Sequence, residues 1–344
     1  MNKRKLIGNL LFLGLVFSAM VYFLFQEQDI SKMIDQISNA NMFYWISGMV
    51  CVIVFIGCES IIIFYLMKNI RQKVRLVHCF LYSFVGFFFS CITPSASGGQ
   101  PVQVYFMRKD KIPVAISTLI LMIVTVTYKM VLIALGIIIL IVKPTQIMFY
   151  FNPAIGFFYL GLVLNILVVG FMIFLIFDPN LARASLINTI NLLNKFHILR
   201  RPEKLINKVN SAVEKYREAA SYFKTHLVVV CNVFLMSVIQ RMLLFYVTYL
   251  VYRSFNLSGI SWVTIILLQG MISVAVDMLP FPGGVGISEK LFLLVFLPIF
   301  GEITLPAMVI SRGLSYYTEL ILSALLTIIA YFTIGKTRER NDIK

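Results

Sequence analysis

Two short segments rich in glycine and proline interrupt sequence that is otherwise apolar enough to lie in a lipid bilayer. The first runs from Thr93 to Pro101 (TPSASGGQP) and the second from Leu279 to Gly286 (LPFPGGVG). Backbone that leaves the helical conformation at membrane depth must be covered by protein or line a water-filled cavity, because lipid offers its N–H and C=O groups no partner. Paired interruptions in two halves of a chain therefore predict a binding site near the middle of the membrane.

Long apolar stretches indicate the fold class. Hydrophobic residues make up 60% of the chain and the mean hydropathy is +0.90, well above the values of soluble proteins. We expect an all-α polytopic membrane protein with about six full transmembrane helices and two broken re-entrant hairpins, at 79–107 and 258–301. The six stretches long enough to cross the hydrocarbon core are 6–25, 42–66, 114–142, 154–177, 227–252 and 304–334.

The basic residues predict the topology, because lysine and arginine collect in cytoplasmic loops. Residues 3–5, 68–75 and 336–340 are all basic segments, so both termini are expected in the cytoplasm. This arrangement is consistent only if each broken region enters and leaves the membrane by the same face. The two hairpins then enter from opposite faces, as in an inverted repeat.

The chain is expected to form a single integral membrane domain over residues 1–344. Its halves are 1–177 and 227–344, and the segment 178–226 between them carries apolar residues at helical spacing. That spacing indicates an amphipathic helix on the cytoplasmic surface. The first apolar stretch is too long for a signal peptide and lacks a small-x-small cleavage pattern, so we expect it to remain as an anchor.

Composition excludes several classes of function. The net charge of +15 lies largely beside membrane spans, where positive-inside topology and anionic lipids explain it better than nucleic acid does. The five cysteines lack metal-ligand spacing, and we expect neither a metal nor a cofactor. The longest non-apolar segment, 178–226, is too short for a typical catalytic domain and the chain carries no familiar catalytic motif, so we expect no catalytic residues.

Ionisable residues inside the apolar stretches are the candidate site residues, because each costs about 2.5–3.5 kcal/mol at a helix centre and needs a partner or water. Lys129, Arg241 and Arg312 are the cations. Together with the free N–H groups of helices that start after the breaks, they would form a pocket for a phosphate. The residues expected to allow close approach of backbone to a ligand there are Gly98, Gly99, Gly283 and Gly284, and Gln100 is a further candidate site residue.

Internal pairing is the alternative for the same cations. Lys129 or Arg241 could pair with Asp277 or Glu319 and hold the bundle together, and such a pair could also form a gate. The sequence leaves both interpretations open.

We expect different roles for two further carboxylates. Glu289 falls in the first turn after Gly286, where a carboxylate complements the helix dipole, and we favour that structural role. Glu59 lies within the span 42–66 and could pair across the bundle or face a cavity. The sequence does not decide between these two roles for Glu59.

At these residues the chain resembles the membrane domain of the lysylphosphatidylglycerol synthase/flippase family, the multiple peptide resistance factor of bacteria. Leu279 to Glu289 (LPFPGGVGISE) resembles the family's Pro-x-Pro-Gly-Gly-x-Gly-x-x-Glu signature. The first break resembles its Gly-Gly-Glu-Pro-x-Arg element, with Gln100 and Gln103 in place of the Glu and the Arg. The resemblance covers essentially the whole chain.

The resemblance implies a function in lipid handling. Full-length members join this membrane domain to a cytoplasmic transferase that moves lysine from lysyl-tRNA to phosphatidylglycerol. The membrane part is thought to move the product outward, which lowers the negative surface charge and confers resistance to cationic peptides. This chain ends at Lys344, soon after the last span, so we expect a stand-alone form without that transferase.

We therefore expect a lipid translocase in the bacterial inner membrane. Its ligand would be an anionic phospholipid or lysylphosphatidylglycerol, whose headgroup crosses a cavity between the breaks while its acyl chains stay in the bilayer. One alternative is phosphatidylglycerol lysyltransferase activity, which would make tRNA a partner. The other is a lipid-binding subunit for a separately encoded transferase. A homo-oligomer is compatible with each.

Overall fold

A computed structural model describes residues 30–178 and 202–334, together with isolated positions between them; for Ile30, 202–212 and 215 it describes the backbone alone. The first predicted span, 6–25, lies outside the described residues, as does the basic segment 336–340. Within the described part the chain is helical and contains five segments long and apolar enough to cross a membrane. Together these confirm the predicted class, a polytopic α-helical membrane protein.

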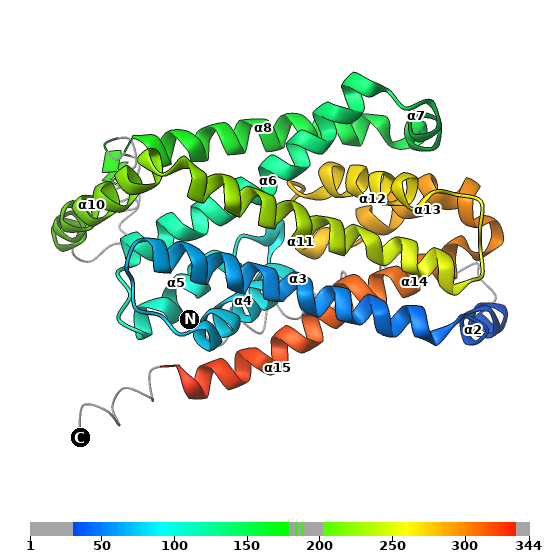
Figure 1. The fold of residues 1–344 in the computed structure, drawn as a ribbon, viewed down its shortest axis with the longest axis horizontal. Coiled ribbons are helices and arrows are strands. Elements are labelled where there is room, and N and C mark those ends of the chain that lie inside the picture. Colours follow the sequence, from blue (N-terminus) through cyan, green and yellow to red (C-terminus); the bar gives the residue numbers. More distant parts are fainter. Residues whose placement is uncertain are drawn as a thin grey trace.

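The helices run mostly along one long axis (Figure 1). Their bounds are α2 (Ile30–Ser38), α3 (Met42–Asn69), α4 (Leu76–Cys91), α5 (Gly99–Lys109), α6 (Val114–Val142), α7 (Thr145–Phe151), α8 (Ile155–Phe177), α10 (Pro202–Thr225), α11 (Leu227–Ser254), α12 (Trp262–Val276), α13 (Ile287–Phe300), α14 (Thr304–Arg312) and α15 (Thr318–Thr333).

Two long antiparallel helices, α3 and α11, lie side by side and define the two ends of the bundle. At one end, the Asn41 amide donates to the carbonyl of Ser254 (2.8 Å). Towards the other, the Asn232 side chain donates to the Tyr65 hydroxyl (3.0 Å). We call the first the α2 end, after the short helix there, and the second the basic end, after the basic loop 68–75 that follows α3.

The first hairpin, α4 and α5, has its mouth at the basic end. His78 near the start of α4 contacts Asp110 just beyond α5, with 2.6 Å between Nδ1 and Oδ2. The chain therefore enters and leaves by one end and turns inside the bundle. The turn is the first break, where a 3-10 segment (Pro94–Ala96) separates the two helices.

The second hairpin, α12 and α13, has its mouth at the α2 end. The Tyr252 ring near the end of α11 packs on Phe300, the last residue of α13, with 5.7 Å between centroids. The Tyr252 hydroxyl also accepts from the Ile260 amide (3.3 Å), just before α12. The two hairpins therefore enter from opposite ends, which confirms the predicted arrangement.

Backbone conformation explains why both hairpins turn at their breaks. In the first break Ser95 and Ala96 have φ values of 51° and 53°, and in the second Gly283 and Gly284 have 58° and 67°. Positive φ ends a right-handed helix, and glycine adopts it at little cost. The second break uses its glycines in this way, whereas in the first the turn falls on two residues that carry side chains.

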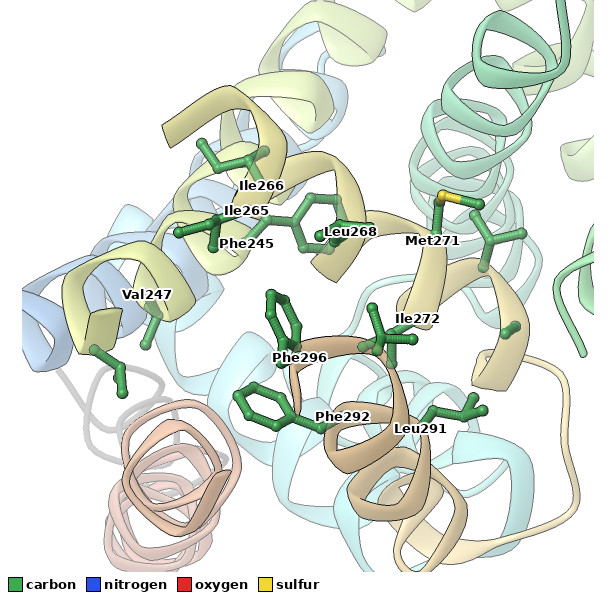
Figure 2. Packing of buried hydrophobic residues seen from close by; sticks show 14 of the residues in the cluster. Phe245, Val247, Ile265, Ile266, Leu268, Met271, Ile272, Leu291, Phe292 and Phe296 are labelled. Carbon is green, nitrogen blue, oxygen red and sulfur yellow. The ribbon is translucent and has the colours of Figure 1, made fainter. Parts of the chain in front are cut away.

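Each hairpin is packed in its own apolar cluster. The cluster at the basic end joins α4, α5 and α10 to parts of α3, α6 and α11. The cluster towards the α2 end surrounds α12 and α13, where Ile272, Phe292 and Phe296 meet Phe245 from α11 (Figure 2). Fully burying a side chain of this size contributes roughly 1.5–3 kcal/mol, so each hairpin is fixed in place by side chains near its break.

The last predicted span, 304–334, differs from a simple helix. A π-helical turn, Gly313–Tyr317, separates α14 from α15. Such turns insert an extra residue per turn and occur often at functional sites. The turn at 313–317 changes the direction in which the side chains after it point, including that of Glu319.

The amphipathic helix predicted in 178–226 is present as α10, which packs on α6, α8 and α11. Tyr216, Ala220 and Phe223 are buried. The Tyr216 hydroxyl donates to the carbonyl of Leu175 (2.9 Å). The described apolar face of α10 therefore contacts the protein.

Candidate functional site

A polar cavity of about 230 Å³ lies where the two breaks meet. Elements from both halves of the chain enclose it, namely α3, α4, α5, α6, α11, α15 and the breaks themselves. We call it the central cavity. Its polar and ionisable lining residues are Glu59, Ser90, Cys91, Gln100, Gln103, Thr125, Tyr128, Arg241, Asp277, Tyr316 and Glu319.

Arg241, near the middle of α11, is the cation that lines this cavity. Its guanidinium lies over the Tyr128 ring, 4.2 Å from the centroid, and 5.4 Å from that of Phe55. Its buried Nε has no hydrogen-bond partner among the residues that the structure describes. Stacking on rings uses the face of the guanidinium and not its N–H edge, so Arg241 keeps at least its Nε donor for a ligand.

Two carboxylates lie within electrostatic range of Arg241, Glu59 from α3 and Glu319 from α15. The Gln103 side chain donates to Glu59 (2.9 Å between Nε2 and Oε1). The Cys91 thiol donates to Glu319 (3.6 Å between Sγ and Oε1), and a thiol is a weak donor. The central cavity thus holds two carboxylates around one arginine.

Lys129 of α6 is held in an ion pair at the edge of the central cavity. Its ammonium donates to Asp277, at the end of α12, and lies 3.4 Å from the side-chain oxygen of Asn165. Lys129 is buried, with a relative exposure of 3%. The pair joins α6 to the start of the second break, which is one of the internal pairings left open by the sequence.

Arg312 and Glu289 form a second pair that holds the second break. The Arg312 Nε donates to a Glu289 oxygen (2.7 Å), and its Nη2 donates to the carbonyl of Gly283 (3.1 Å). The other Glu289 oxygen accepts from the Gly286 amide (2.6 Å), in the first turn of α13. One carboxylate therefore caps a helix and binds an arginine that also contacts the turn.

The glycines of the breaks allow close approach of protein to protein. A methyl group on Gly99 would lie 2.6 Å from the backbone oxygen of Gly86 in α4, and one on Gly283 would lie 2.1 Å from the Tyr316 ring. A methyl group on Gly98 would meet the Thr93 side chain at 2.5 Å, whereas Gly284 has room for one but a positive φ.

Gln100 follows the glycine pair of the first break and lines the central cavity. Its side-chain amide donates to the Thr125 hydroxyl on α6. Gln103, one turn later on α5, binds Glu59 as described above. Both glutamines of the first motif are therefore engaged in the lining of the central cavity.

A smaller cavity of about 130 Å³ adjoins the central one, and we call it the side cavity. Gly283, Tyr316 and Glu319 line both. The Tyr316 hydroxyl, in the π-helical turn before α15, donates to the carbonyl of Cys91 (3.1 Å) and so joins the last span to the first hairpin near this boundary. Polar groups that line the side cavity are Thr248, Gln269, Ser273, Ser288, Arg312 and Ser315.

A third hollow of about 560 Å³, the mouth cavity, lies at the mouth of the first hairpin on the basic end. Lys68, Lys73 and Arg75 line it and are exposed. His78 and Tyr82 also line it, and both contact Asp110. The lining of the mouth cavity therefore has more basic than acidic side chains, whereas that of the central cavity has more acidic than basic ones.

The site residues predicted from the sequence thus separate into three groups. Arg241, Glu319 and Gln100 line the central cavity together with Asp277 and Gly283, whereas Lys129 is buried behind Asp277. Arg312 and Glu289 lie beside the second break, and Arg312 lines the side cavity. Gly98, Gly99 and Gly284 shape the breaks.

Several cavity residues lay outside the sequence-based selection, among them two tyrosines and a threonine. Tyr128, Thr125 and Tyr316 look like ordinary span residues because they are uncharged and sit in apolar helices. A neighbouring ionisable residue is the one available signal, since Tyr128 precedes Lys129 in the sequence.

Comparison with known proteins identifies the family of the chain. Comparison with curated proteins gave no match. The sequence profile described as the lysylphosphatidylglycerol synthase TM region matches residues 10–323, which is most of the chain and includes both breaks and every side chain of the central cavity. The chain is therefore a multi-pass membrane protein that belongs to the lysylphosphatidylglycerol synthase transmembrane-region family.

Proposed function

We propose that this protein is a lipid translocase, and that the central cavity carries the headgroup of an aminoacylated phospholipid such as lysylphosphatidylglycerol. The observation that carries the proposal is a polar cavity inside a membrane bundle, lined by Arg241, Glu59 and Glu319 at the meeting point of two hairpins. Polar groups at this depth are expensive and usually mark a substrate path.

The charge of the lining favours a headgroup that carries both signs. The pairs Lys129–Asp277 and Arg312–Glu289 are each neutral overall. Arg241 with the two carboxylates leaves one formal negative charge when all three are ionised. A plain anionic headgroup would meet this excess, whereas a headgroup with ammonium groups beside its phosphate complements it: phosphate on Arg241, ammonium on Glu59 or Glu319.

A path for the headgroup follows from the same geometry. The cationic mouth cavity would attract the lipid phosphate at the basic end, and the polar side cavity would extend the path towards the α2 end. Acyl chains would remain in the bilayer. By the positive-inside rule we assign the basic end to the cytoplasm of a bacterial cell, so that outward transport would lower the negative surface charge and confer resistance to cationic peptides.

Proteoliposomes give the direct test. Fluorescent lysylphosphatidylglycerol and fluorescent phosphatidylglycerol would be compared for movement between leaflets, with wild-type protein, Arg241→Gln and Lys32→Gln. Lys32 is a matched control because it forms an exposed ion pair with Glu302. We expect faster movement of the lysyl lipid, at least a tenfold loss in Arg241→Gln, since about 1.4 kcal/mol corresponds to tenfold, and no loss in Lys32→Gln. Equal movement with and without protein would overturn the proposal.

The same preparation distinguishes the other activities suggested by the family. Incubation with labelled lysyl-tRNA and phosphatidylglycerol would give labelled lipid if the chain were a lysyltransferase. Lipid binding without movement, together with co-purification of a transferase, would indicate a lipid-binding subunit. Under the proposal, labelled lipid is not formed and movement needs no second protein.

A further inference from the structure

Two carboxylates share one arginine in the central cavity. Glu59 comes from α3, Glu319 from α15 and Arg241 from α11, so three separate helices bring the groups together. The three side chains are half-buried and the cavity lies between packed apolar clusters, so solvent screens their charges less than at an exposed surface. One arginine balances one carboxylate and leaves the second without a counter-charge.

Among the residues that the structure describes, neighbouring groups do not supply that counter-charge. Glu59 receives the neutral amide of Gln103, and Glu319 receives the thiol of Cys91. Arg312 lies within electrostatic range of Glu319 but is committed to Glu289. The remaining charged or titratable groups that face the cavity or lie at its edge are Tyr128, Lys129, Asp277 and Tyr316, and of these Lys129 and Asp277 neutralise each other.

Protonation of one of the two carboxylates removes this excess of negative charge. Two carboxylates that share a site do not both ionise readily, and a buried charge without a partner is strongly disfavoured. With one proton on the pair, one carboxyl group is neutral and the charge of the other is balanced by Arg241, which lies within electrostatic range of both. The arrangement is then neutral and ready for a ligand.

We propose that Glu59 and Glu319 form a proton-exchange pair: it holds one proton when the cavity is empty and releases it when the ammonium group of a lipid enters. The inference rests on the proposed function and adds to it an energy source. An O–H bond of the carboxyl group breaks, the proton passes to water, and the resulting carboxylate binds the ammonium group. No other bond changes.

The proton and the ammonium group of the lipid cannot occupy the pair together, so binding of one requires release of the other. The second carboxylate is neutralised either by a proton or by the ammonium group, because both together would leave a buried positive charge. When the lipid leaves on the far side, a proton from that side must take its place. One proton would therefore move inward for each lipid that moves outward, and a proton gradient would drive lipid export.

A binding experiment tests the pair without requiring transport. Protein in detergent and weak buffer would be titrated with short-chain lysylphosphatidylglycerol, and released protons would be counted with a pH dye. We expect close to one proton per bound lipid in wild type. Either single substitution, Glu59→Gln or Glu319→Gln, should abolish release, because the remaining carboxylate is already balanced by Arg241.

Matched variants distinguish loss of the titratable group from loss of folding. Glu59→Asp and Glu319→Asp keep a titratable carboxyl group and should retain proton release. Glu302→Gln removes an exposed carboxylate at the α2 end and should leave the count unchanged. If the Gln variants bind the lipid and still release a proton, Glu59 and Glu319 are not the exchange pair.

A transport experiment tests the coupling. Movement of the lysyl lipid in proteoliposomes would be measured with and without a pH gradient, the acidic side being the destination. We expect the gradient to accelerate wild type severalfold and to leave Glu319→Gln unaffected. Binding or movement without proton release would overturn the inference and leave the proposed function standing, whereas absence of both binding and movement would overturn the proposed function itself.

Discussion

The hydroxyl of Ser95 donates a hydrogen bond to the carbonyl of Leu279, 184 residues further along the chain (3.2 Å). This contact joins the first break to the second inside the bundle. The first break thereby supplies part of the polar cover that the second needs, because backbone groups outside a helix have no partner in lipid. The two interruptions are best understood as one structural unit.

Removal of the Ser95 hydroxyl tests that unit. Ser95→Ala leaves the Leu279 carbonyl without this donor, and a hydrogen bond of this kind contributes about 0.5–1.5 kcal/mol. We expect a lower thermal unfolding midpoint in detergent and slower lipid movement. Ser258→Ala, at an exposed position in the loop between α11 and α12, provides a comparison. An unchanged midpoint for Ser95→Ala would show that the breaks do not depend on this contact.

Gly283→Ala should damage the second break. Gly283 has a φ of 58°, and an added methyl group would lie 2.1 Å from the Tyr316 ring. Strained backbone of this kind costs about 1–3 kcal/mol before the clash is counted. We expect a destabilised protein that no longer moves lipid. Gly156→Ala is the matched control, since it lies on helix α8 with open space around its added methyl group.

Lys129 and Asp277 can be tested as a structural pair. Lys129→Met leaves the carboxylate of Asp277 without its partner and should cost about 3–5 kcal/mol, as for other broken buried pairs. Lys129→Met combined with Asp277→Leu removes both charges and should recover most of the loss. Thermal unfolding measures this. If lipid movement stays absent in the recovered double variant, Lys129 or Asp277 also acts on the lipid.

Arg312 and Glu289 should be energetically coupled. Glu289→Gln keeps an oxygen that can accept from the Gly286 amide but loses the ion pair, and Arg312→Gln loses the bond to the Gly283 carbonyl as well. A double-mutant cycle on unfolding free energies should give a coupling of about 0.5–3 kcal/mol. Simple additivity would mean that the pair contributes nothing beyond its separate members.

Tyr216 gives a prediction about pH outside the membrane spans. Burial raises the pKa of its hydroxyl from 10.0 to about 12. Stability from the bond to Leu175 should therefore be complete below pH 10 and lost as the pH rises towards 12, because the unfolded chain ionises first. Tyr216→Phe should lose about 1 kcal/mol at neutral pH and the tyrosine-linked part of this pH dependence. Tyr159→Phe, on the exposed side of α8, is the control.

Much of the fold could be predicted because its signals are local. Apolar length predicts α3, α6, α8 and α11 nearly to their ends, since crossing a bilayer requires a fixed number of residues. Basic loops predict that the hairpins open at opposite ends. The π-helical turn at 313–317 has no such signal, because it depends on how α14 and α15 pack on their neighbours.

For the candidate site, the sequence predicted which residues take part but not which of them are in contact. An ionisable residue in an apolar stretch is visible in the sequence, so Lys129, Arg241 and Arg312 could be selected. The sequence did not show which of these cations forms an ion pair. Helix α11 is apolar around most of its circumference, so no amphipathic pattern predicts the direction of the Arg241 side chain. Glu59 could not be assigned for the same reason.

By itself, the sequence determined that this is a polytopic membrane protein with two interrupted hairpins and a few costly charges at membrane depth. Hydropathy, glycine and proline act on their immediate neighbours, and that is enough for those conclusions. Only the tertiary structure decided that Lys129 meets Asp277, 148 residues away, and that Arg241 remains with two carboxylates. Charges at this depth interact through space over a few ångströms, and the packing of distant helices sets those separations.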